Sequence, residues 1–194
     1  LDAAKQVKLV IWDRGSKAVR VFDAPFANSR SSFFDTPLWQ PHGNRLILRR
    51  GSGEPAYLVD AADGKVLAAI EGTIDNPFSP DGKYLISKSA DGRSLLLHDA
   101  ATGVTERTIA APMRIRDARF VSNGIIAAMS INCEIIHSRV TSGEASWVPI
   151  RAADDNCSLS RIAEDGVHAV VEINSNQWTV LSLATGKTVY AAPS

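Results

Sequence analysis

The sequence predicts an all-β fold built from repeated four-stranded antiparallel sheets. Three observations predict it. Two series of glycines recur in step along the chain, short runs of β-branched, aliphatic and aromatic residues lie between them, and no long stretch has the periodicity of a helix. Only Leu1–Gln6 could form a short helical turn.

The first glycine series has a large apolar residue four positions before each glycine, as Phe78 stands before Gly82. Its members are Gly43, Gly82, Gly124 and Gly166, which are separated by 39, 42 and 42 residues. The second series is Gly64, Gly103, Gly143 and Gly186, separated by 39, 40 and 43 residues. Tight hairpin turns need a positive φ, which glycine adopts without strain, so both series predict hairpin turns with glycine in that conformation.

The runs between the glycines have the length and composition of strands. Adding the strand that ends just before each glycine of the first series gives four strands per unit of about 40 to 45 residues, which is typical of a β-propeller blade. The chain is then a single domain, 1–194, with units near 1–30 (partial), 31–71, 72–111, 112–151 and 152–194. The expected strands after the first glycines are Arg45–Leu48, Tyr84–Ser87, Ile125–Ala128 and Ala169–Ile173; the next are Ala56–Val59, Ser94–Leu97, Glu134–Ile136 and Trp178–Leu181; the last are Val66–Ile70, Thr105–Ile109, Ser146–Ile150 and Thr188–Tyr190.

Over nearly its whole length the chain resembles the WD40-like β-propeller family, with degenerate repeats. The best match is Phe78–Ile109, and Trp12-Asp13 stands where the family has its name-giving dipeptide. Val59-Asp60 and His98-Asp99 are weakened versions, and the last two units depart further. No Gly-His pair precedes any inner strand, so the side-chain network typical of strict members is not expected. A different propeller subfamily is the alternative.

The strand count predicts an incomplete ring. The chain begins with the third and fourth strands of a blade, at Val7–Asp13 and Ala18–Phe22, and continues for about four and a half to five blades. An open arc leaves unpaired strand edges and apolar blade faces in water. We therefore expect this chain to be part of a larger ring, completed by a missing N-terminal segment or by a second chain. The alternative is closure as five blades with the help of residues 1–6.

The two cysteines fall where a disulfide is possible. Cys133 lies in the turn between the second and third strands of one unit, and Cys157 at the entry to the first strand of the next, on the same face of neighbouring blades. A bridge would stabilise the fold by roughly 3 kcal/mol and indicate a periplasmic or extracellular protein. Two reduced thiols in a cytoplasmic protein are the alternative.

Composition and motifs argue against several functions. Lys and Arg number 21, as do Asp and Glu, which does not favour a broad nucleic-acid surface. No apolar stretch is long enough to span a membrane as a helix. The four histidines do not share metal-ligand spacing, and no nucleophile elbow or phosphate-binding glycine loop occurs, so no metal, cofactor or catalytic residue is predicted.

The candidate binding residues are on the loops of the face that carries the cysteines. Arg114, Arg116 and Asp117 lead into an inner strand and are expected to rim the central channel, with Arg49 and Arg50 nearby. The family resemblance implies a non-catalytic scaffold or sensing module that binds a protein or peptide. The alternative is a propeller domain or subunit of an extracytoplasmic enzyme, of dehydrogenase or peptidase type.

Overall fold

A computed structural model describes residues 8–24, 36–49, 55–72, 77–132, 134–140, 145–147, 157–162, 167–173, 177–182, 185 and 187–191. Within these residues there is no helix, which confirms the all-β prediction, and none therefore has the length and apolarity that a membrane span requires. The strands are β1 (Lys8–Trp12), β2 (Val19–Asp23), β3 (Leu38–Trp39), β4 (Arg45–Leu48), β5 (Ala56–Asp60), β6 (Val66–Ile70), β7 (Tyr84–Lys88), β8 (Ser94–Asp99), β9 (Thr105–Ala110), β10 (Ile115–Ser122), β11 (Ile125–Ser130), β12 (Ile135–Arg139), β13 (Ala145–Trp147), β14 (Cys157–Ile162), β15 (His168–Ile173), β16 (Gln177–Ser182) and β17 (Thr188–Ala191).

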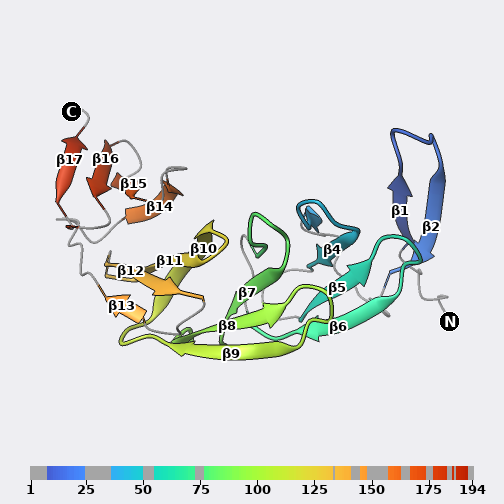
Figure 1. Ribbon diagram of the computed structural model, residues 1–194, viewed down its shortest axis with the longest axis horizontal. Coiled ribbons are helices and arrows are strands. Elements are labelled where there is room, and N and C mark those ends of the chain that lie inside the picture. The colour runs from blue at the N-terminus through green and yellow to red at the C-terminus, as the bar shows by residue number, and fades with distance from the viewer. Residues whose placement is uncertain are drawn as a thin grey trace, which may run out of the picture.

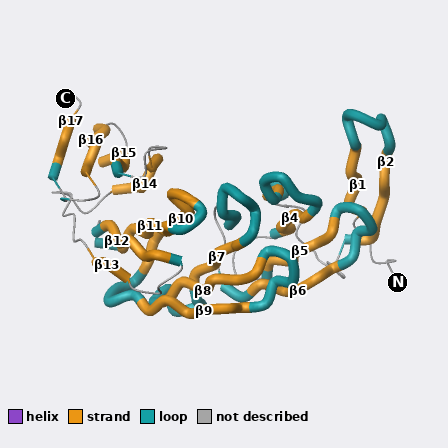
Figure 2. The backbone as a smooth tube through the Cα atoms, in the orientation of Figure 1, coloured by secondary structure: helices purple, strands orange, loops and turns teal. Residues whose placement is uncertain are grey.

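The strands form separate antiparallel sheets that follow one another in chain order. They are β1–β2, β3–β4–β5–β6, β7–β8–β9, β10–β11–β12–β13 and β14–β15–β16–β17, here called the first to the fifth blade. Figure 1 shows these blades along an arc, with β1–β2 at one end and β14–β17 at the other. The same path, traced in Figure 2, is one of strands joined by turns. The innermost strand β10 contacts both β7 and β14, which is how blades stand around a common axis.

The third blade has three named strands where four were expected. Phe78 stands in the place of the innermost strand and forms a single bridge with Leu85. Pro77 and Pro80 flank this position, and proline has no N–H to donate to a ladder. Among the described residues, the inner strand of this blade is therefore represented by the Phe78 bridge and by the hydrogen bond from Ile86 N to Pro77 O, and Phe78 belongs to the core.

Two turns of the third blade are built in the same way. In each, a serine N–H bonds the carbonyl oxygen five residues on, the serine hydroxyl donates to an aspartate at 2.7 Å, and a glycine with φ near 70° follows; the turns are Ser79–Gly82 and Ser89–Gly92. Only glycine takes this φ without strain. The local sequence Ser-X-Asp-Gly thus closes both hairpins.

The prediction of positive φ is right at Gly64, Gly82 and Gly103, where φ is 75°, 72° and 76°. It is wrong at Gly43 and Gly124. In the turn of the second blade, His42 has the left-handed conformation instead, with φ 55°. The strand that precedes Gly124 has a bulge between Phe120 and Ser122, which changes the path of the chain into that turn. Gly143, Gly166 and Gly186 lie outside the described residues.

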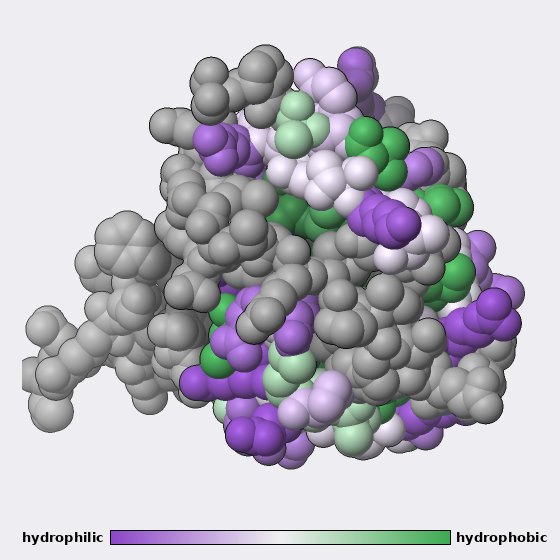
Figure 3. Space-filling model, turned by 90° about the vertical axis from the view of Figure 1, so that its left-hand side faces the viewer, coloured by the Kyte–Doolittle hydropathy of each residue, from purple (hydrophilic) through white to green (hydrophobic). Residues whose placement is uncertain are grey.

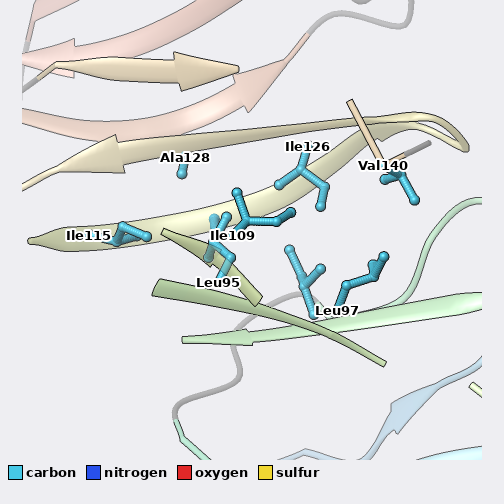
Figure 4. Close-up of a cluster of buried hydrophobic side chains, with 9 residues drawn as sticks. Leu95, Leu97, Ile109, Ile115, Ile126, Ala128 and Val140 are labelled. Atoms are coloured by element: carbon cyan, nitrogen blue, oxygen red, sulfur yellow. The ribbon is translucent and has the colours of Figure 1, made fainter. Parts of the chain in front are cut away.

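The hydrophobic core lies between the blades. Each blade presents one set of alternating residues to the preceding blade and the other set to the next. Between the third and fourth blades, Leu95, Leu97 and Ile109 point toward Ile115 and Ile126, as Figure 4 shows. Similar clusters join the first to the second blade and the second to the third. Each buried Leu or Ile contributes roughly 1.5–3 kcal/mol, so the interfaces between blades hold the arc together.

The outward faces of the two end blades are apolar and exposed. On β1–β2, four exposed residues share one face in two cross-strand pairs, Val10 with Val21 and Trp12 with Val19. At the other end, Trp178 and Tyr190 are exposed. Figure 3 looks onto that end and shows hydrophobic residues at the surface between hydrophilic ones. Both ends of the arc thus carry apolar surface of the type that is buried between the inner blades.

Candidate interaction face

The loops between the third and fourth blades are tied to each other by backbone hydrogen bonds. Ile115 N donates to Gly92 O at 2.7 Å, Ala111 N to Arg93 O at 2.8 Å, and Ile131 N to Arg114 O at 3.0 Å. The first and third bonds join the β7–β8 turn and the β11–β12 turn to the start of β10. The second joins the end of β9 to the start of β8. The backbone on both sides of Ile115 is therefore fixed by its neighbours.

Four basic side chains gather on this fixed backbone and are called the basic rim: Lys88, Arg93, Arg114 and Arg116. The three arginines are exposed and Lys88 is half-buried. Lys88 Nζ donates to the carbonyl oxygen of Arg116 at 2.6 Å. The Arg114 side chain lies against the β7–β8 turn, where a Cβ added at Gly92 would stand 3.1 Å from its Cγ. Hence the rim spans two blades.

Asp91 is the acidic residue inside the basic rim, and its own turn engages it. Its carboxylate accepts hydrogen bonds from the Arg93 N–H at 2.9 Å and from the Ser89 hydroxyl at 2.7 Å. The Arg93 backbone bond and then the Ser89 bond lower the pKa of Asp91 below its ordinary value. Among the described residues of the rim, Asp91 is thus already engaged by its own turn, and positive charges outnumber negative ones.

The carboxylate of Asp117 forms an ion pair with Arg119. Its Oδ2 lies 2.8 Å from an Arg119 guanidinium nitrogen, and both side chains are only 22% exposed. Sequence reasoning included Asp117 but missed Arg119. The signal for it was present, because residues two apart on a strand lie on one face. Arg114 and Arg116 are exposed on either side of Ile115, which is buried in the core.

Arg49 follows β4 and is half-buried. Arg49 in the second blade is equivalent to Lys88 in the third. Each lies three residues after the leucine, Leu46 or Leu85, that pairs with the inner aromatic residue of its blade. The partner of Arg49 in the prediction, Arg50, lies outside the described residues. The predicted binding residues are therefore distributed over two segments. Arg114 directly precedes β10, and Arg116 and Asp117 lie at its start, whereas Arg49 and Arg50 follow β4.

Known structures identify the arrangement of the blades. No family model matches the sequence, and no curated protein matches it either. Among solved structures, the β-propeller domain of Cps50 (Swd1) from Myceliophteria thermophila matches with a TM-score of 0.66 at 16% sequence identity. The match covers 84% of this chain and 56% of that one.

The chain has a β-propeller fold. It accounts for about four and a half to five blades, as the strand count predicts, and it spans 56% of the length of the propeller domain it matches. An identity of 16% supports no statement about activity.

The predicted disulfide lies outside what the structure describes. Cys133 is not among the described residues, and Cys157 is described only through its backbone, at the start of β14. The placement of Cys157 at the entry to the first strand of a blade is confirmed. No described contact supports the bridge itself, which stays a prediction.

His98 is a buried histidine that joins three strands of the third blade. It is 1% exposed. Its Nε2 lies 2.9 Å from the Ser87 hydroxyl on β7, and its Nδ1 lies 3.0 Å from the Thr105 hydroxyl on β9. A neutral imidazole has one donor and one acceptor nitrogen, and hydroxyls fill either role. Among the described residues, no group of three His, Cys, Asp or Glu side chains is arranged to hold a metal ion.

Proposed function

We propose that this propeller is a non-catalytic interaction module whose basic rim binds an acidic segment of a protein partner. The observation that carries the proposal is the pair Arg114 and Arg116, exposed on either side of the buried Ile115. The match to a propeller domain supports a scaffold of this general kind.

The fixed backbone of the rim favours tight recognition. Ordering a flexible loop on binding costs free energy, and the bonds from Ile115 N and Ile131 N hold this loop before any partner arrives. Arginine offers a planar fork of donors that matches a carboxylate in two hydrogen bonds. An acidic peptide with carboxylates in alternate positions would therefore pair with several cations at once, and its binding would weaken as salt rises.

We also propose that the repeats are degenerate WD40-type repeats. The aspartates of the expected dipeptides support this, because each closes the turn after the third strand of its blade. Asp13 accepts from Gly15 N and Ser16 N, both at 2.9 Å; Asp60 accepts from Ala62 N at 2.8 Å; and Asp99 accepts from Thr102 N at 2.7 Å. A shared turn chemistry at one repeat position is consistent with descent from one repeat.

Ring completion forms a further part of the proposal. The first blade has two described strands, and their outward face is apolar. At the other end, the cross-strand pair Val170–Val180 is equivalent to the pair Ile86–Leu97 of the third blade. Ile86 and Leu97 belong to the core between the third and fourth blades. We infer that further blade-like structure, from a preceding segment or a second chain, covers these faces.

The rim is tested with a fluorescent polyglutamate peptide and two matched double variants. Arg114→Ala plus Arg116→Ala removes two charges from the rim, and Lys65→Ala plus Lys83→Ala removes two exposed charges from turns on the opposite face. We expect the rim variant to weaken binding roughly tenfold or more and the control to retain the affinity of the parent chain.

Equal losses in both double variants would show a general charge effect and contradict the proposal. Single-stranded and duplex DNA of matched charge serve as competitors. Preferential binding of either nucleic acid at the rim would also overturn it, since the proposed partner is an acidic protein segment.

A further inference from the structure

The inner edge of the first blade pairs with no described strand. In the second blade, β5 pairs with β4 on its inner side and with β6 on its outer side. The strand β1 occupies the place of β5, because Asp13 and Asp60 close the same turn, but β1 pairs only with β2 among the described strands. Among the described residues its inner edge therefore has no backbone partner, and an edge of this kind favours pairing with another strand.

The direction of each amide in β1 follows from one hydrogen bond. Asp13 N donates to Ala18 O at 2.9 Å, across the β1–β2 hairpin. N–H groups alternate between the two edges of a strand, so the amides of Leu9 and Ile11 also point to β2. The amides of Val10 and Trp12 then point to the unpaired edge. The second blade has the same pattern, with Asp60 N bonded to the outer side and Ala61 N to the inner side.

Trp39 is exposed where its counterparts are covered. It pairs with Leu46, as Phe78 pairs with Leu85 and Phe120 with Ile126 in the next two blades. Phe78 is 8% exposed and belongs to the core shared with the preceding blade, whereas Trp39 is 52% exposed. The blade that precedes Phe78 has inner strands, and the described part of the blade that precedes Trp39 has none. The exposure of Trp39 thus coincides with the place where the described part of the first blade contributes no inner strand.

A recess of about 560 Å³ opens between β1 and the second blade at this place. Its lining combines the apolar side chains of Ile11, Trp12 and Trp39 with polar and charged residues, which are Asp13, Arg14, Arg20 and Asn44. That volume holds several side chains, apolar ones against the two tryptophans and polar ones against the charged residues. The strands that carry them would lie along the open edge of β1.

We propose that the recess and the inner edge of β1 bind an antiparallel β-hairpin of a partner polypeptide. One strand of the hairpin pairs with β1 through the amides of Val10 and Trp12, and the other covers Trp39 with large apolar residues. A second copy of this chain, packed face to face on Val10, Trp12, Val19 and Val21, would leave both the edge and Trp39 uncovered, so the hairpin fits better. The inference rests on ring completion in the proposed function and is independent of the basic rim.

The probe is a peptide with the sequence of residues 113–132, which form the inner hairpin β10–β11 of the fourth blade. It is added in trans to the full chain, and a scrambled peptide of the same composition is the control. We expect saturable binding, a blue shift of tryptophan fluorescence, and slower hydrogen exchange at the amides of Val10 and Trp12. The amides of Leu9 and Ile11, already bonded to β2, should change less.

Three variants test the geometry. Val10→Pro removes an amide of the unpaired edge and leaves the β1–β2 ladder intact, since proline is tolerated at edge strands, and it should abolish binding. Val10→Thr retains the amide and should bind like the parent chain. Trp39→Ala should weaken binding roughly tenfold.

The inference is overturned if the parent chain does not bind the peptide, or if Val10→Pro binds as tightly as Val10→Thr. It is also overturned if the chain alone dimerises with concentration and protects the Val10 face, because a second copy is then the occupant. Binding of polyglutamate by the same variants reports separately on the basic rim. A failure of one part is thus distinguishable from a failure of the other.

Discussion

Nε2 of Gln40 donates a 2.6 Å hydrogen bond to the carbonyl oxygen of Gly82, in the equivalent turn of the next blade. One blade further on, the Asp81 N–H donates to Oδ1 of Asn123 at 2.8 Å. Both contacts join residues 42 positions apart. The hairpin turns of neighbouring blades are therefore in direct contact on this face. At Gly82 the preceding blade occupies the space that a side chain would need.

Replacement of Gly82 by Ala is expected to destabilise the propeller. Gly82 has a φ of 72°, and a Cβ there would lie 2.4 Å from the carbonyl oxygen of Pro41. The left-handed conformation alone costs an alanine roughly 1–2 kcal/mol, and the clash adds to it. Urea denaturation measures the loss. Gly124→Ala is the matched control, since no atom lies within 4 Å of its added Cβ, and it should leave stability unchanged or slightly raised. Equal losses at both glycines would contradict the contact.

Replacement of Ser138 by Ala is expected to stabilise the propeller. The Ser138 hydroxyl is buried in the apolar core between the third and fourth blades, and it has no hydrogen-bond partner among the described residues. A buried unsatisfied hydroxyl costs roughly 1–3 kcal/mol, so its removal should raise the free energy of unfolding by about 1 kcal/mol. Ser79→Ala should have the opposite effect, because the equally buried Ser79 hydroxyl bonds Asp81 and accepts from Tyr84 N. A loss of stability in Ser138→Ala would show that the hydroxyl is satisfied.

Local features of the sequence predicted most of the strands. Arg45–Leu48 and Val66–Ile70 have the predicted bounds, and the other described strands differ by a few residues at their ends. Short β-branched and aliphatic runs between turn residues suffice for this, because a hairpin depends on residues close in sequence. The missed turn glycine, Gly92, was also readable. It repeats the Ser-X-Asp-Gly pattern of Gly82 ten residues later.

Features that depend on a neighbouring blade could not be predicted. Trp39 and Phe78 stand at the same point of the repeat, and the sequence gives no reason for one to be exposed and the other buried. The difference arises from the strands that the preceding blade contributes. The ion pair of Asp117 with Arg119 is similar, because its partial burial depends on how β10 packs between two blades. The basic residues of the rim could be predicted from the sequence. The hydrogen bonds that join the start of β10 to Gly92 and Ile131 could not.

A disulfide between Cys133 and Cys157 is one of the two states that the sequence predicts, and two reduced thiols are the other. The prediction rests on their places in the repeat, with Cys133 between β11 and β12 and Cys157 at the start of β14. Intact-mass measurement of the unfolded chain, with and without reductant, should show a gain of two hydrogens on reduction. Reduction should also lower stability by roughly 3 kcal/mol. A mass that reductant does not change would contradict the bridge and with it the extracytoplasmic localisation that the bridge implies.

His98 is expected to make the stability of the propeller depend on pH. Its burial lowers the pKa of the imidazole below the ordinary 6.5, and the bond with the Gly103 backbone and the charge of Glu71 only partly oppose this. The unfolded chain therefore binds a proton at a higher pH than the folded chain does. Stability is complete above pH 6.5 and falls as the pH drops from 6.5 toward the folded-state pKa, by at most about 1.4 kcal/mol per pH unit.

The measurement is urea denaturation between pH 7.5 and pH 5 for the parent chain and for His98→Val. Valine is the residue that the second blade has at the equivalent position, Val59. The variant leaves the hydroxyls of Ser87 and Thr105 without the imidazole, so its stability should be lower at every pH. Its dependence on pH below 6.5 should nevertheless be weaker, because the buried titrating group is gone. If the two chains lose stability in parallel as the pH falls, groups other than His98 are responsible, and the imidazole is not held neutral by the fold.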